Sequence, residues 1–110
     1  MNLKFACTKT QFIDAMKKEL GVYGLLIESD GDVKSVIETW LANDGVSSGL
    51  RFIEPAECKV DGERVIVGIR PTWELEMFGD AGEIREPDRR WILNVFNRLQ
   101  KTILAPEETD

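Results

Sequence analysis

The sequence predicts an α+β fold, a single small domain in which a β-α-β-α segment precedes an antiparallel meander and a C-terminal helix. Three segments, residues 10–20, 33–41 and 87–104, repeat apolar residues at the spacing of an amphipathic helix. Residues 56–70 instead alternate around an Asp-Gly pair, which is typical of a hairpin. We expect the helices to lie mostly on one face of a mixed sheet.

A strand and a helix are expected at the N-terminus. Leu3, Phe5 and Cys7 alternate with more polar residues, which favours a short strand. Thr8 and Gln11 have the spacing of a capping box, and Gly21 is a typical helix stop. Between them, three apolar side chains share one helical face: Phe12, Met16 and Leu20.

Residues 22–27 form a short, almost wholly apolar run. We interpret this run as a central strand buried on both faces, which completes an early βαβ unit. Residues 29–32 then end this strand and offer an N-cap for a helix. The next segment places five apolar side chains on one helical face: Val33, Val36, Ile37, Trp40 and Leu41.

The middle of the chain predicts a short strand over residues 50–54, stopped by Pro55, and then a hairpin. Asp61-Gly62 is expected to form a two-residue type I′ turn, which would place Val60 opposite Glu63. One face of this ribbon is then apolar and holds Ala56, Cys58, Val60, Val65, Val67 and Ile69. The other face holds Glu57, Lys59, Arg64, Ile66 and Arg70.

Residues 72–78 alternate again, which predicts a strand with Trp73 inward and the two glutamates Glu74 and Glu76 outward. Glu86-Pro87 is expected to open the last helix, because proline is favoured at the first helical position. The apolar stripe of this helix consists of Ile92, Phe96, Leu99 and Ile103. The whole chain is predicted to be one globular domain over residues 1–105, with an acidic, flexible tail over residues 106–110.

Composition excludes several classes of function. The chain has 110 residues and no histidine, so Ser-His-Asp and Cys-His catalysis and histidine-ligated metals are impossible. No nucleotide-binding fingerprint is present, and Asp30-Gly31-Asp32 fails the EF-hand template, because position 12 is Leu41. We therefore expect no enzymatic activity, no catalytic residue, no cofactor and no metal.

Charge and cysteine content indicate location and partners. The formal net charge is −6, which disfavours direct binding to nucleic acid or to anionic membranes. Two cysteines without a CxxC motif, no recognisable signal peptide and no long apolar run predict a cytoplasmic protein with reduced thiols. Both cysteines fall on apolar strand faces, where they are expected to act as small hydrophobic residues.

Residues 72–88, called here the acidic strip, contain six acidic residues and one arginine, which leaves a charge of −5. Such a strip can dock on a basic surface, or it can be a solvated face kept polar for solubility. The basic residues of the last helix can bind nucleic acid or an acidic partner, or they can form a solvent face that pairs with the strip. The negative charge of the whole chain favours the pairing with the strip. The candidate partner-binding residues are Glu74, Glu76, Phe78, Asp80, Glu83 and Glu86.

These features favour a non-enzymatic, acidic protein-protein interaction module, an inhibitor or antagonist that binds a basic surface of another protein. Bacterial immunity proteins and phage-encoded inhibitors of host defence, including nucleic-acid mimics, share this physical profile. One alternative is a structural or assembly subunit that forms a homodimer or larger homo-oligomer in a phage or bacterial complex. A compact enzyme that uses Glu74 and Glu76 as paired carboxylates is the remaining hypothesis.

Overall fold

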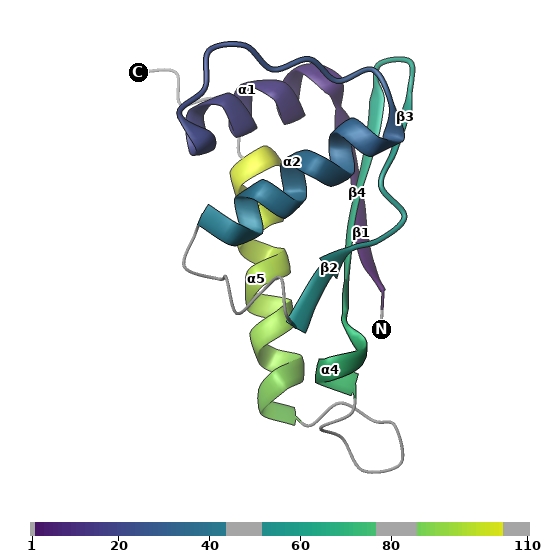
Figure 1. Ribbon diagram of the computed structural model, residues 1–110, viewed down its shortest axis with the longest axis vertical. Coiled ribbons are helices and arrows are strands. Elements are labelled where there is room, and N and C mark those ends of the chain that lie inside the picture. The colour runs from purple at the N-terminus through teal and green to yellow at the C-terminus, as the bar shows by residue number, and fades with distance from the viewer. Residues whose placement is uncertain (1, 44–51, 77–85, 105–110) are drawn as a thin grey trace.

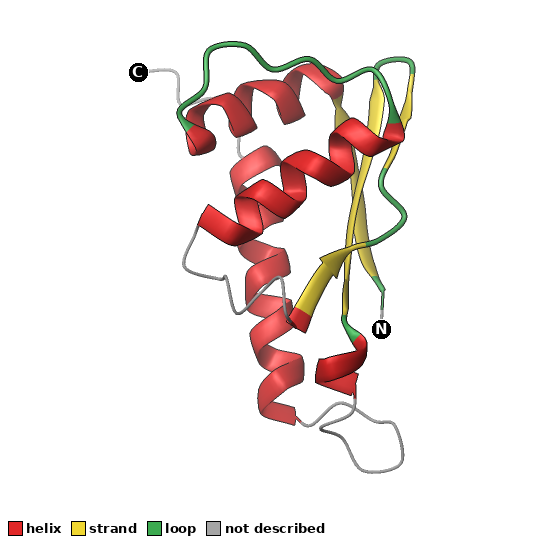
Figure 2. Ribbon diagram, in the orientation of Figure 1, coloured by secondary structure: helices red, strands yellow, loops and turns green. Residues whose placement is uncertain are grey.

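The sheet has four strands, all paired antiparallel, and helices cover one of its faces (Figure 1 and Figure 2). This computed structural model describes residues 2–43, 52–76 and 86–104. The fold class is α+β, as the sequence predicts. The elements are β1 (Leu3–Thr8), α1 (Lys9–Leu20), α2 (Asp30–Asn43), β2 (Ile53–Pro55), β3 (Lys59–Asp61), β4 (Arg64–Pro71), α4 (Trp73–Glu76) and α5 (Glu86–Leu104).

Strand β4 is the centre of the sheet. β1 pairs along one side of it, from Leu3 opposite Ile69 to Thr8 opposite Arg64. β2 and β3 pair one after the other along its second side. The described strands include no parallel pair, so the expectation of a mixed sheet with an early βαβ unit is wrong.

The ends of α1 follow the local sequence. The Thr8 hydroxyl accepts a hydrogen bond from the Gln11 amide at 3.0 Å, and the Gln11 side chain accepts one from the Thr8 amide at 2.9 Å. This reciprocal pair is the predicted capping box. Gly21 ends the helix with a φ of 65°, in the left-handed region that glycine adopts without steric cost.

The core lies between the sheet and helices α1, α2 and α5. Phe5 of β1 meets Phe96 of α5 edge-to-face, with ring centroids 5.7 Å apart. Trp40 of α2 is buried, as predicted, and its indole nitrogen donates to Glu19 at 3.2 Å. The apolar stripes predicted for all three helices point into this core. Their side chains are buried, except that Leu20 is only partly buried against it.

Residues 22–27 are a loop and not the predicted central strand. Tyr23 is 97% exposed and Leu26 is 71% exposed, whereas Ile27 is buried. The loop carries the chain from the end of α1 to the start of α2 (Figure 1). A strand buried on both faces needs a neighbouring strand on each side, and no described strand pairs with residues 22–27.

The predicted hairpin forms, with a different turn. Asp61 pairs with Arg64, so the turn residues are Gly62 and Glu63, and Val60 lies opposite Val65. Gly62 has a φ of 60° and Glu63 has no positive φ, which is the type II′ pattern and not type I′. The register differs from the prediction by two residues, and such a shift leaves each side chain on its predicted face.

Residues 73–76 form the short helix α4 and not a strand. Trp73 is 66% exposed, whereas Leu75 is buried, so the prediction that Trp73 points inward is wrong. Pro71, opposite Ile53, is the last residue of β4 with a strand partner. After Pro71, the described residues offer no further strand partner. The chain instead forms one helical turn, and this turn buries Leu75.

Candidate functional site

Two surfaces of opposite charge lie near the two ends of β4. The first, called here the acidic end, consists of α4 and the first turn of α5. Both lie at the same end of the long axis of the molecule (Figure 1). Its described acidic residues are Glu74, Glu76, Glu86 and Asp88.

Phe52 holds the acidic end together. Its carbonyl accepts a hydrogen bond from the amide of Thr72, directly before α4, at 2.8 Å. Its ring contacts Trp91 of α5 edge-to-face, with centroids 6.4 Å apart. One residue beside β2 thus connects the chain entering α4 with the N-terminal half of α5.

Trp73 is the apolar feature of this surface. Its side chain is among the large hydrophobic ones that the described residues leave exposed, and it is followed in α4 by Glu74. Tryptophan is one of the residues that most often anchor protein interfaces. An exposed indole within an acidic surface therefore offers both an apolar contact and a charge that selects the partner.

The structure brings part of the predicted site together. Glu74, Glu76 and Glu86 all belong to the acidic end, whereas Phe78, Asp80 and Glu83 lie outside the described residues. Glu86 lies 3.5 Å from the guanidinium of Arg90 on the same helix, an exposed pair. This pair joins an acidic residue of the strip to a basic residue of the last helix, and both residues belong to α5.

Glu74 and Glu76 do not form the paired carboxylates of one strand face. They lie two positions apart in a helical turn, and residues with this spacing do not face each other on a helix.

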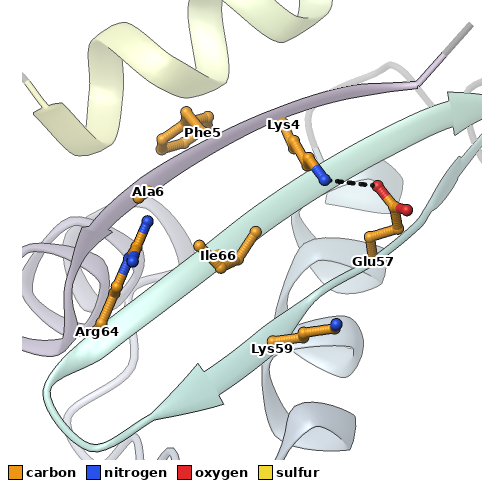
Figure 3. Close-up of a pocket in the computed structure, with 7 residues that line it drawn as sticks. All are labelled: Lys4, Phe5, Ala6, Glu57, Lys59, Arg64 and Ile66. Atoms are coloured by element: carbon orange, nitrogen blue, oxygen red, sulfur yellow. Dashed lines mark ion pairs between the residues drawn. The ribbon is translucent and has the colours of Figure 1, made fainter.

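The second surface, called here the basic face, is the part of the sheet opposite the helices. It contains a shallow hollow of about 360 Å³ (Figure 3). Ile66 and Ala6 form its floor, and charged side chains surround them. Three cations and one carboxylate leave this hollow with a charge of +2: Lys4, Lys59, Arg64 and Glu57.

A β-bulge forms one wall of the hollow. Between the pairs Pro55–Ile69 and Lys59–Ile66, residues 56–58 oppose only two residues of β4. Glu57 at the bulge has a φ of 59°, the one positive value at a non-glycine residue in the described part of the chain. This backbone turns the Glu57 carboxylate toward Lys4, whose amino group is 3.3 Å away (Figure 3).

Gly68 makes the bulge possible. The Ala56 amide donates to the Gly68 carbonyl at 2.9 Å, so the two backbones are in close contact. A Cβ atom on Gly68 would lie 2.1 Å from the Ala56 carbonyl oxygen, which no side chain can tolerate. The geometry of the basic face therefore depends on this glycine.

The start of α2 protects the outer edge of the hairpin. The Asp30 carboxylate accepts a hydrogen bond from the Val60 amide at 2.8 Å, which satisfies a donor on the edge strand β3. The Asp32 carboxylate accepts bonds from the amides of Glu28 and Ser29, and these bonds hold its pKa below the usual value. Asp30-Gly31-Asp32 is therefore a turn and helix cap, as the failed EF-hand template indicates.

Neither cysteine is an activated nucleophile. Burial raises the pKa of the Cys7 thiol to about 11 and also raises the pKa of Cys58, whose sulfur donates to the Gly68 carbonyl at 3.5 Å. Thiols with raised pKa values stay protonated at neutral pH and react slowly.

Among the described residues, no cluster of three or more acidic or cysteine side chains is placed to hold a metal ion. None of the described helices is long and apolar enough to cross a membrane.

Sequence reasoning missed two features of these surfaces. The exposure of Trp73 was hidden by an alternating pattern that fits a strand and a helical turn equally well. The hairpin pattern did place Lys59, Arg64 and Ile66 on one face, but Lys4 joins them only because β1 pairs with β4. That long-range pairing leaves no local pattern in the sequence.

Comparisons with protein-family models, with curated proteins and with solved structures found no match to this chain. An α+β fold by itself hosts many functions, so function has to come from the surfaces.

Proposed function

We propose that this protein is a non-enzymatic interaction module whose acidic end binds a basic surface of another protein. In this role it acts as an inhibitor or antagonist, of the immunity type or of the type that phages use against host defence. The observation that carries the proposal is the 66% exposure of Trp73 within the acidic end.

Trp73 supplies the affinity in this proposal. Burying an aromatic side chain at the centre of an interface contributes far more binding energy than the polar contacts around it. Truncation of such an anchor typically costs about 2 kcal/mol or more, which corresponds to a roughly 30-fold loss of affinity.

The carboxylates supply selectivity. Glu74, Glu76 and Glu86 favour approach to a basic surface, and the net charge of −6 adds to this field over the whole molecule. Exposed charges act through solvent and are screened by salt, so binding should weaken as ionic strength rises. The same charges repel nucleic acid, so the partner we propose is a protein. Basic surfaces on proteins commonly bind polyanions, and an acidic protein can occupy such a surface in their place.

The test is capture of partners from the native host. Three proteins are compared, with mass spectrometry to identify what is retained: the tagged parent, a Trp73→Ala variant and a lysine variant. The lysine variant changes Glu74 and Glu76 of the acidic end together with Asp80 and Glu83, the next two acidic residues of the acidic strip. A basic protein should be retained by the parent and released by both variants.

A charge-matched control separates the acidic end from net charge. Changing four carboxylates elsewhere, Asp14, Glu28, Glu38 and Glu63, to lysine alters the total charge equally and should leave capture intact. Capture that survives the change at the acidic end, or that the control abolishes to the same degree, would contradict the proposal. Circular dichroism checks that every variant is folded.

A further inference from the structure

We infer that the basic face of one copy of this protein binds the acidic end of a second copy, head to tail. This inference rests on the proposed role of the acidic end as a binding surface, and it names a partner for that surface. The proposed function uses only the acidic end. The inference adds a ligand for the basic face, namely the acidic end of a second copy.

Two of the three cations of the basic face have no side-chain partner among the described residues, whereas Lys4 pairs with Glu57. Lys59 and Arg64 have neither an ion pair nor a hydrogen bond from their side chains to other described residues. Between them the partly buried side chain of Ile66 forms an apolar floor with Ala6 (Figure 3). Unpaired cations around an apolar floor suit a ligand that is apolar at its centre and anionic at its rim.

The acidic end has this complementary pattern. Trp73 provides an exposed apolar ring, and α4 and the first turn of α5, which carry the glutamates, lie at the same end of the molecule. Cations near a tryptophan ring are attracted by its π electrons, most strongly when water is excluded. The molecule already contains such a contact, since the Arg98 guanidinium lies 5.4 Å from the centroid of the Trp40 ring.

The two surfaces cannot meet within one molecule. Arg64 is the first residue of β4, and Trp73 follows directly after its last residues, Pro71 and Thr72. Eight strand residues span roughly 26 Å at the usual rise per residue. The contact is therefore between copies, and it joins different surfaces of the two copies.

An interface of this kind is heterologous, so each copy in a pair keeps one surface that can bind a further copy. Assemblies should thus grow with protein concentration and fall apart in salt. Self-association also covers the acidic end, so an external basic partner and a second copy would compete for Trp73. The equilibrium between copies would then regulate how much of the binding surface is free.

A nucleic acid is the other candidate occupant of three cations on a sheet. The chain as a whole has a charge of −6, so it repels a polyanion that approaches it. A second copy presents only a local group of carboxylates, and its own basic face partly offsets the repulsion between the two molecules.

Sedimentation velocity over a wide range of protein concentrations, in about 20 mM and about 300 mM NaCl, tests the inference. The parent should form assemblies that grow with concentration at low salt and dissociate at high salt. Two variants, Lys59→Glu with Arg64→Glu and Glu74→Lys with Glu76→Lys, should each be monomeric, because each lacks one of the two surfaces.

Mixing these two variants is the decisive step. Each retains the surface that the other has lost, so the mixture should form a heterodimer and nothing larger. A variant with the same charge change elsewhere, Lys18→Glu with Lys101→Glu, should assemble like the parent. A parent that remains monomeric at high micromolar concentration, or a mixture that remains monomeric, overturns the inference. So does assembly that the basic-face variant leaves unchanged.

The outcomes separate this inference from the proposed function. The Lys59→Glu, Arg64→Glu variant should still capture a basic partner from the host, because its acidic end is intact. If the mixed variants form a heterodimer but no basic partner is captured, the proposed function fails and the inference stands. If a DNA oligonucleotide binds the parent through Lys59 and Arg64 while no self-association occurs, the basic face is a nucleic-acid site and the inference fails.

Discussion

The hairpin end and the acidic end of β4 differ in how their surfaces are built. The basic face at the hairpin end depends on the backbone, because a bulge at Glu57 and a close contact at Gly68 set the position of its side chains. The acidic end depends on side chains placed by a single helical turn, with Trp73 left in solvent. Substitutions that disturb the basic face should therefore lower the free energy of unfolding. Substitutions at the acidic end should weaken binding and leave the free energy of unfolding almost unchanged.

The largest expected effect is that of Gly68→Ala. The new Cβ would lie 2.1 Å from the Ala56 carbonyl oxygen, which belongs to paired backbone and cannot move alone. Overpacking of this kind typically costs about 3 kcal/mol in the free energy of unfolding. Chemical denaturation measures it.

Gly24→Ala is the matched control, because a Cβ at Gly24 meets no atom within 4 Å. It should change the free energy of unfolding by less than about 1 kcal/mol. If Gly68→Ala were as well tolerated as Gly24→Ala, the bulge would not be a fixed feature and the difference between the two ends would disappear.

The next effect belongs to the acidic end. Trp73→Ala should weaken partner capture or self-association roughly 30-fold and leave the free energy of unfolding within about 0.5 kcal/mol of the parent. The indole is mostly exposed, so its removal leaves no cavity. Trp40→Ala supplies the contrast, since truncating this buried ring should cost about 4 kcal/mol of stability. A large loss of stability in Trp73→Ala would show that the ring is structural.

The same contrast explains how far the sequence could be interpreted. Helices α1, α2 and α5 follow from apolar spacing, because amphipathic helices are encoded within a few turns. The strand predicted at residues 22–27 is wrong, because an apolar run does not by itself encode pairing with a strand far away in the sequence. Glu74, Glu76 and Glu86 were found from charge alone, whereas the roles of Trp73 and Lys4 required the tertiary arrangement.

A smaller effect is expected from Glu57→Gly, which should stabilise the protein by about 1 kcal/mol. The left-handed conformation of Glu57 costs about 1–2 kcal/mol for a residue with a side chain, and glycine removes this cost. The lost ion pair with Lys4 is exposed and contributes less than about 1 kcal/mol. Glu57→Ala keeps the strain and loses the pair, so it should be slightly destabilising. If both variants had the same stability, the backbone of the bulge would be unstrained.

The smallest effect concerns pH and the support of the hairpin edge by α2. Amide donors from Glu28 and Ser29 lower the pKa of Asp32 in the folded state relative to the unfolded chain. A lowered folded-state pKa adds stability above the unfolded pKa of about 4, and this stability is lost as pH falls through the folded value. Asp32→Asn should therefore reduce stability at neutral pH and make its decline below about pH 4 shallower. Because Asp32 is only partly buried and its hydrogen bonds are close to solvent, the change should be smaller than that of Glu57→Gly. Thermal unfolding from neutral to acidic pH measures it, and parallel curves for variant and parent would mean that the Asp32 cap contributes nothing to the stability of the start of α2.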